Sequence, residues 1–163
     1  MIPEELNQDP IVAAIRERFP DAIQEARRDL GELTLIIAPG HLVEVCRFLK
    51  REQTFVRLSS VTGVDWMPRT PRLEVVYHIE SVARKQRLRL KAWAGGEPPA
   101  IDSVTPVWRG ADWYEREVFD LFGVVFRNHP DMRRIMMPDT WEGHPLRKDF
   151  PVHGYKYSYA DEE

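Results

Sequence analysis

The sequence predicts an α+β fold: a two-layer domain with helices packed on a mixed sheet of about five strands, followed by a long extended C-terminal tail. Three observations support this prediction. Two early segments have apolar residues at helical spacing, and three later segments alternate apolar with polar residues. The last part has little periodicity and prolines at near-even intervals. We therefore divide the chain into an α+β domain over residues 1–126 and an extended docking tail over residues 127–163.

Length and composition limit the possible functions. The chain has 163 residues, of which 43% are hydrophobic and 30% charged, as is typical of one soluble globular domain. A net charge of -3 gives no overall field that favours nucleic acid. No apolar run approaches the roughly 20 residues of a spanning helix, so we expect any membrane association to arise through partners. The acidic N-terminus has no features of a signal or transit peptide.

The single cysteine excludes two kinds of site. Cys46 has no second cysteine with which to form an internal disulfide, and the chain cannot supply four cysteines to an iron–sulfur cluster. Because Cys46 falls on the apolar face of a predicted helix, we expect a buried structural residue.

Two amphipathic helices are predicted in the first third of the chain. Asp9 is a typical N-cap for a helix over Pro10–Phe19, in which apolar residues recur every four positions. From Leu42 to Arg51 apolar residues recur at i, i+3, i+4 and i+7, which predicts a second helix.

Strands are predicted between and after these helices. The segments are residues 22–28, Leu33–Ala38, Phe55–Val64, Arg72–Glu80 and Lys85–Ala94. The last two are expected to form a hairpin. Residues 95–110, which contain three prolines, are interpreted as a linking loop.

The predicted hairpin has a basic face that allows two interpretations. One plausible register places Glu80 opposite Arg87 and His78 opposite Arg89 on a solvated face. With Lys91, the second strand is basic and would suit nucleic acid. No pair of aromatic residues of the kind that stacks RNA bases interleaves these positions. We therefore favour a solvated sheet face, or one that meets an acidic partner.

A third helix is predicted at Trp113–Phe122. Asp112 and Glu115 resemble a capping box, and Gly123 suits a left-handed stop. Glu117 and Asp120 are spaced i, i+3 and invite an acid–base interpretation, but nothing in the sequence indicates a substrate pocket. We favour buried salt bridges, within the chain or to a neighbour, with Arg116, Arg133, Arg134 or Arg147.

Histidines in the tail invite a metal interpretation. His129, His144 and His153, with Asp131 and Asp139, match no compact zinc motif. Two of these histidines precede proline, which favours extended or turn backbone. We therefore interpret them as turn or interface residues.

The tail contains apolar side chains that a solvated linker would not need. They are Ile135, Met136, Met137, Trp141, Leu146 and Phe150. A segment of this length without periodicity, stiffened by proline, suits docking across another protein. Trp141 and Phe150 would serve as anchors, while Arg133, Arg134, Arg147 and Lys148 would pair with acidic groups.

These residues also resemble a known family. Glu115-Arg116-Glu117, Asp120-Leu121-Phe122, His129, Arg133, Ile135-Met136 and the run from Met137-Pro138-Asp139 to Phe150-Pro151 are similar to the signature of the C subunit of the proton-pumping NADH-quinone oxidoreductase, respiratory complex I. Thr140 stands where an acidic residue is common. The specific match covers the last third of the chain, and the remainder agrees in length and element order.

The resemblance implies a component of the peripheral arm that binds no cofactor and has no catalytic or metal-binding residue. The complex would use NADH, FMN, iron–sulfur clusters and quinone. The implied partners are the D subunit, above all, and the B and I subunits, at the cytoplasmic face of the bacterial inner membrane. Membrane-bound hydrogenases and ferredoxin or quinone oxidoreductases with similar modules are the alternative. The expected partner-interface residues are Glu115, Arg116, Glu117, Asp120, His129, Arg133, Arg134, Trp141, His144, Arg147, Lys148 and Phe150.

Overall fold

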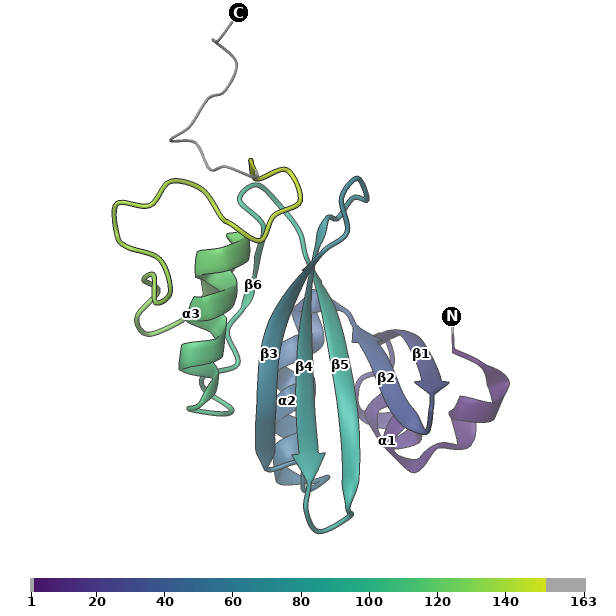
Figure 1. Ribbon diagram of the computed structural model, residues 1–163. Helices are drawn as coiled ribbons and strands as arrows, with labels where there is room; N and C mark the ends of the chain where they lie inside the picture. Colours follow the sequence, from purple (N-terminus) through teal and green to yellow (C-terminus); the bar gives the residue numbers. More distant parts are fainter. Residues whose placement is uncertain (1, 152–163) are drawn as a thin grey trace, which may run out of the picture.

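A mixed sheet with helices on one face forms the centre of the computed structural model, which describes residues 2–151. Within that range the sheet has five strands in the order β1-β2-β5-β4-β3 (Figure 1). The strands are β1 (Ile23–Asp29), β2 (Glu32–Ile37), β3 (Arg57–Asp65), β4 (Leu73–Ser81) and β5 (Gln86–Ala94). All neighbours pair antiparallel except β2 and β5, which are parallel. The predicted α+β class is confirmed.

Helices α1 (Pro10–Arg18) and α2 (Leu42–Arg51) lie behind the sheet in Figure 1. The Asp9 carboxylate accepts the first free N–H groups of α1, 2.8 Å from Ile11 N, as its position predicts. The side of α2 that faces the sheet is fully buried and includes Cys46. Burial raises the pKa of the Cys46 thiol well above its ordinary value, so this cysteine is a small core residue. Short 3-10 turns, Glu4–Gln8 and Pro39–His41, precede the two helices.

The β4–β5 hairpin has the predicted register. Glu80 is opposite Arg87 and His78 is opposite Arg89. The pattern fixes this register because a slip by one residue would turn every apolar side chain of the strand away from the core.

The predicted loop over residues 95–110 contains a strand. Strand β6 (Ala100–Asp102) pairs in parallel with β7 (Val125–Arg127). Each strand has only three residues, too few to show a periodicity, and the partner follows a helix later in the chain.

Helix α3 (Ala111–Phe122) lies beside β3, at the opposite end of the sheet from α1 (Figure 1). A Cβ on Gly63 of β3 would lie 2.7 Å from the Phe122 ring, so glycine allows this close approach. The predicted capping box is wrong: the N-cap is Gly110, and it makes no side-chain cap hydrogen bond. Gly123 ends the helix with a left-handed φ of 76°, as predicted. Within residues 2–151, no helix is long and apolar enough to cross a membrane.

Candidate docking site

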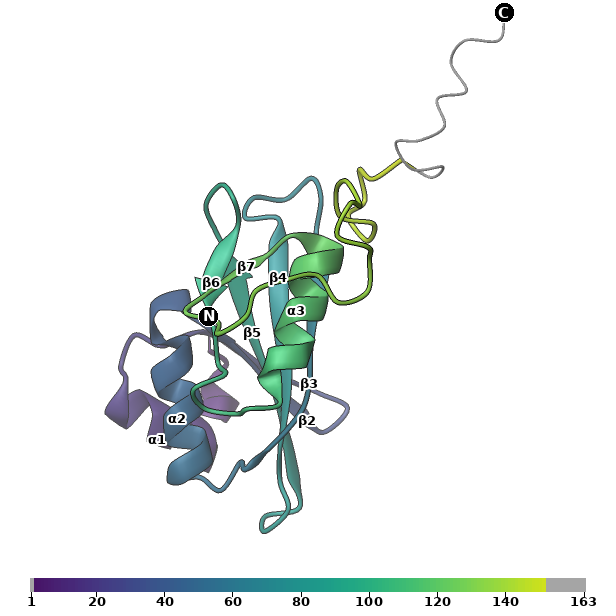
Figure 2. The same ribbon diagram turned by 90° about the vertical axis from the view of Figure 1, so that its left-hand side faces the viewer.

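Residues 128–151, which we call the arm, follow β7 and run back along α3. Within these residues there is no helix or strand. Figure 2 shows the arm crossing beside α3 and ending near the C-terminal end of that helix. The remainder of the predicted tail, residues 152–163 with His153, lies outside the described residues.

The Asp120 carboxylate is the first anchor of the arm. One oxygen accepts the backbone N–H groups of Ile135, Met136 and Met137 at 3.0, 2.7 and 2.8 Å. The other accepts from the Arg134 guanidinium at 2.5 Å. Burial opposes ionisation of Asp120, but these donors outweigh it and hold its pKa below the usual range. The buried salt bridge predicted for Asp120 is therefore present, and it explains why a carboxylate is tolerated near the C-terminal end of a helix. The one predicted for Glu117 is not found, because Glu117 is exposed.

The last turn of α3 is the second anchor. Its free carbonyls accept donors from the arm: Asp120 O lies 2.9 Å from His144 Nδ1, Leu121 O 3.0 Å from Leu146 N, and Phe122 O 2.6 Å from Arg147 Nε. These groups have no partner within a helix, so the arm caps α3.

Gly123 makes the second anchor possible. A Cβ at this position would lie 2.5 Å from the His144 ring and from Arg147 Nη2. Glycine therefore serves two purposes here, because it also adopts the left-handed turn that ends α3.

Asp65, at the end of β3, is the third anchor. Its carboxylate accepts the Lys148 backbone N–H at 2.8 Å and two nitrogens of Arg72, the closer at 2.5 Å. Arg72 also bonds to Asp149 at 2.6 Å, so one guanidinium joins the sheet to the end of the arm. The hydrogen bonds from Arg72 hold the pKa of Asp65 far below its usual range. Sequence reasoning missed Asp65 and Arg72 because neither lies near the arm in the chain.

The root of the arm contacts the first half of α3 through a buried polar cluster. Glu115 is fully buried and accepts from Ser103 Oγ at 2.6 Å and Val104 N at 2.7 Å. Burial raises its pKa to about 7 although both hydrogen bonds oppose the shift. His129 Nε2 lies 3.9 Å from the Glu115 carboxylate, and Asp131 N donates to His129 Nδ1 at 3.0 Å.

Large apolar side chains are exposed on α3 and on the arm. Trp113 is 63% exposed, Met136 62%, Leu146 52% and Trp141 37%. We call these four residues the arm face. Trp113, which was not among the predicted interface residues, contacts the Arg116 guanidinium 5.3 Å from the centre of its ring.

The predicted interface residues differ in their surroundings. Arg116, Asp120, Arg134, His144 and Arg147 make hydrogen bonds within the chain and hold the arm in place. Glu117, Arg133, Trp141 and Lys148 are exposed, Glu115 and His129 lie in the buried cluster, and Phe150 stacks against Trp141.

The acid–base interpretation does not fit the geometry. Glu117 is exposed, whereas the Asp120 carboxylate is buried and occupied by four donors. Among residues 2–151, no group of three or more His, Cys, Asp or Glu side chains is placed to hold a metal ion.

The basic hairpin face is neutralised by carboxylates. Lys91 bonds to Glu74 at 2.9 Å, Arg87 lies 3.2 Å from Glu80, and Arg89 pairs with Glu32. Lys91 and Glu74 are buried, so this part of the face is not solvated as predicted. Because its cations are paired within the chain, the face does not favour a nucleic-acid surface.

The chain is similar in sequence to known proteins of one family. The family model described as respiratory-chain NADH dehydrogenase, 30 Kd subunit, matches residues 35–156. The C subunit of the NADH-quinone oxidoreductase of Geotalea uraniireducens is 48% identical over 88% of this chain and 87% of its own length. A C subunit, numbered 2, of the same enzyme from Rhizobium etli is 46% identical over 93% of this chain and 79% of its own length.

Two solved structures share the fold. A trypsin-resistant fragment of Nqo5 is 29% identical with a TM-score of 0.64, and the match covers 73% of this chain and 96% of the fragment. A chain of a membrane-bound sulfane sulfur reductase, an archaeal respiratory membrane complex, is 26% identical with a TM-score of 0.71 over 94% of both chains.

The fold, the anchored arm and these similarities define a component of a respiratory membrane complex. The resemblance inferred from the arm residues is confirmed by the family model and by relatives that match most of the chain. The chain belongs to the family of the 30 kDa subunit of the respiratory-chain NADH dehydrogenase, and it is a subunit of NADH-quinone oxidoreductase, an enzyme complex.

Proposed function

We propose that this chain is a scaffold whose arm face docks onto the quinone-reducing module of the complex. The D subunit is the main partner, and the B and I subunits are neighbours. Electrons pass from NADH through FMN and iron–sulfur clusters to quinone on other components of the complex, while this chain binds no cofactor. The complex holds it at the cytoplasmic face of the bacterial inner membrane.

The single observation that supports this proposal is that the arm is fixed by buried polar groups while it exposes large apolar side chains. Buried polar groups fix its backbone, while Met136, Trp141 and Leu146 remain exposed. Large apolar and aromatic side chains of this kind are the groups that protein interfaces bury. Because the arm is already ordered, docking loses little conformational entropy.

The proposed division at residue 126 has separate support. The trypsin-resistant fragment of the Nqo5 relative covers 73% of this chain, which leaves about a quarter of it outside the match. We infer that residues 1–126 form the stable domain and that residues 127–163 serve docking. Three anchors hold the described part of this segment to the domain.

The alternative function is that of the equivalent component of a related respiratory complex. The sulfane sulfur reductase chain matches 94% of this chain, but it is only 26% identical. The 48% identity to the C subunit of an NADH-quinone oxidoreductase favours the NADH-linked complex.

Co-purification tests the proposal. Met136→Glu with Leu146→Glu places charges on the arm face, and both side chains are exposed in the free chain. We expect the recovery of the D subunit with the tagged full-length chain to fall about tenfold or more. Val82→Glu, on an exposed residue of the β4–β5 turn, is the matched control and should leave recovery unchanged. Full recovery of the D subunit with the double variant would contradict the proposal.

A further inference from the structure

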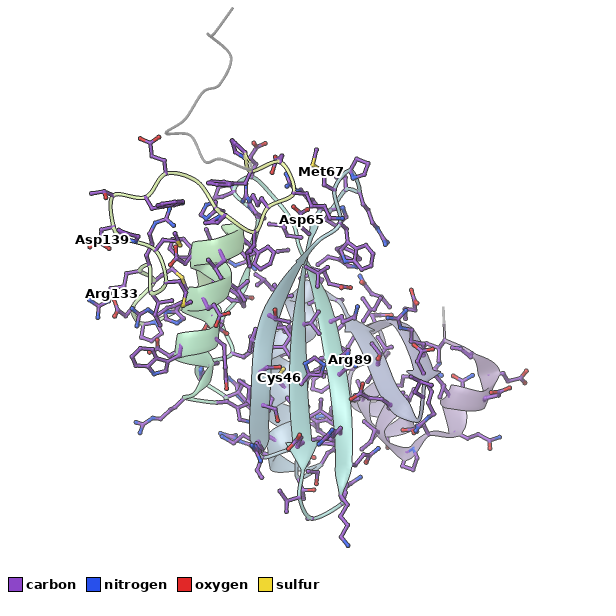
Figure 3. The ribbon with its side chains drawn as sticks, in the orientation of Figure 1. Cys46, Asp65, Met67, Arg89, Arg133 and Asp139 are labelled. Atoms are coloured by element: carbon purple, nitrogen blue, oxygen red, sulfur yellow. The ribbon has the colours of Figure 1, made fainter. Side chains whose placement is uncertain are left out.

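Residues 138–142, which we call the arm tip, form the longest unbroken run of exposed residues in the arm. All five of these side chains are exposed, whereas the residues on either side are partly buried. Figure 3 shows Asp139 at the outer edge of the arm, on the side away from the sheet.

The arm tip is held in one shape although it projects. Trp141 N donates to Pro138 O at 2.9 Å, which closes a turn. The Trp141 ring stacks on Phe150, with ring centres 6.4 Å apart and planes inclined by 17°. Gly143 follows with a φ of 76°, and its carbonyl accepts from Arg134 Nη2 at 3.1 Å. Since Arg134 also binds Asp120, the turn is tied to the first anchor.

The stacking leaves part of the Trp141 ring available to another molecule. The residue is 37% exposed even though Phe150 covers one of its faces. An ordered aromatic ring of this kind contributes a large apolar contact at small entropic cost, which is why tryptophan is enriched among binding hot spots.

Within residues 128–151, the arm tip also carries the carboxylates that form no ion pair with a described residue. Asp139 and Glu142 flank Trp141, and neither forms an ion pair with another of residues 2–151. The arm's other carboxylates are paired: Asp131 lies 2.8 Å from Arg133, and Asp149 lies 2.6 Å from Arg72. The tip therefore presents an aromatic ring between two uncompensated carboxylates.

We propose that the arm tip inserts Trp141 into an apolar pocket on the D subunit, and that lysine or arginine side chains on the rim of this pocket face Asp139 and Glu142. The inference rests on the proposed docking function and specifies the chemistry of the partner surface. Buried aromatic anchors control the dissociation rate, whereas rim charges control the association rate and its salt dependence. The two halves of the proposal therefore have separate kinetic signatures.

Binding of the purified full-length chain to the immobilised D subunit tests the proposal. We expect Trp141→Ala to raise the dissociation rate about tenfold. We expect added salt to slow association of the unaltered chain. Asp139→Lys with Glu142→Lys should lower the association rate about tenfold at low ionic strength and abolish this slowing. Asp21→Lys with Glu25→Lys changes the same number of exposed carboxylates away from the arm and should change neither rate.

The outcomes separate this inference from the proposed function. Unaltered rates for both arm-tip variants, with the unaltered chain still binding, would overturn the arm-tip inference and leave docking through the arm face intact. No binding of the unaltered chain would count against both. Hydrogen exchange at residues 135–137 shows whether the arm keeps its structure in each variant. If Trp141→Ala disturbs the arm, the test rests on Asp139→Lys with Glu142→Lys, because that variant leaves the stacked rings in place.

Discussion

Replacing Asp120 with asparagine is expected to release the arm from α3. Asparagine has the same shape but only one carbonyl oxygen. Either the three N–H groups of residues 135–137 or the Arg134 guanidinium must then face an amide NH2 group. A buried site that is filled by four donors cannot accommodate a further donor without losing hydrogen bonds.

The size of the effect follows from the burial of the pair. Removing one partner of a buried ion pair costs about 3–5 kcal/mol, and hydrogen bonds to a charged group are each worth about 1.5–3 kcal/mol. Because the Arg134 side chain is 17% exposed and regains some hydration, we take the lower end, about 3 kcal/mol. The equilibrium for opening the arm should then shift about 100-fold towards the open form.

Hydrogen exchange gives the direct measurement. Protection of the amides of residues 135–137 should fall about 100-fold in Asp120→Asn, while that of β4 should stay the same because the sheet core does not involve the arm. Trypsin should also cleave faster after Arg133 and Arg134. Equal protection in the two proteins would refute the assignment of Asp120 as an anchor.

Acid provides an independent check of the same anchor. The folded-state pKa of Asp120 is lowered, so its stabilising effect is present above the ordinary carboxyl pKa and is lost as pH falls through the lowered value. The unaltered chain should therefore approach the behaviour of Asp120→Asn in acid.

Two further substitutions test the neighbouring sites. Gly123→Ala should displace His144 and Arg147 and strain the left-handed turn, which should lower the free energy of unfolding by about 1–3 kcal/mol. The Leu146 amide should then exchange faster. An unchanged exchange rate there would show that the second anchor tolerates a side chain. Glu115→Gln should alter the pH dependence of stability. The pKa of Glu115 is raised from 4.5 to about 7, so its contribution is present below its unfolded pKa and is lost as pH rises through 7. In urea unfolding between pH 5 and pH 8, the free energy of unfolding of the unaltered chain should fall by about 2.5 kcal/mol more than that of Glu115→Gln. Parallel pH profiles would contradict the burial of an ionisable Glu115.

Local patterns in the sequence determined the helices and the hairpin. Asp9 and the apolar spacing after it specify α1, and the alternation along β4 and β5 specifies which faces are buried and hence the register. These features repeat over a few residues, so they can be read without knowing the rest of the fold. The run from Glu115 to Pro151 likewise indicated the family from residue identity alone, and the family model confirmed it.

Only the tertiary structure decided which polar groups meet. Asp65 and Lys148 are 83 positions apart, and no periodicity connects them. Glu115 was expected in a capping box but lies in the core, because the loop after β6 supplies Ser103 and Val104 as donors. Proline spacing indicated an extended tail, yet Asp120 and the free carbonyls of α3 hold the arm against the domain. Sequence patterns indicate which residues prefer burial or a given backbone conformation. Hydrogen bonds between residues distant in the chain form only when the packed elements bring donor and acceptor within about 3 Å.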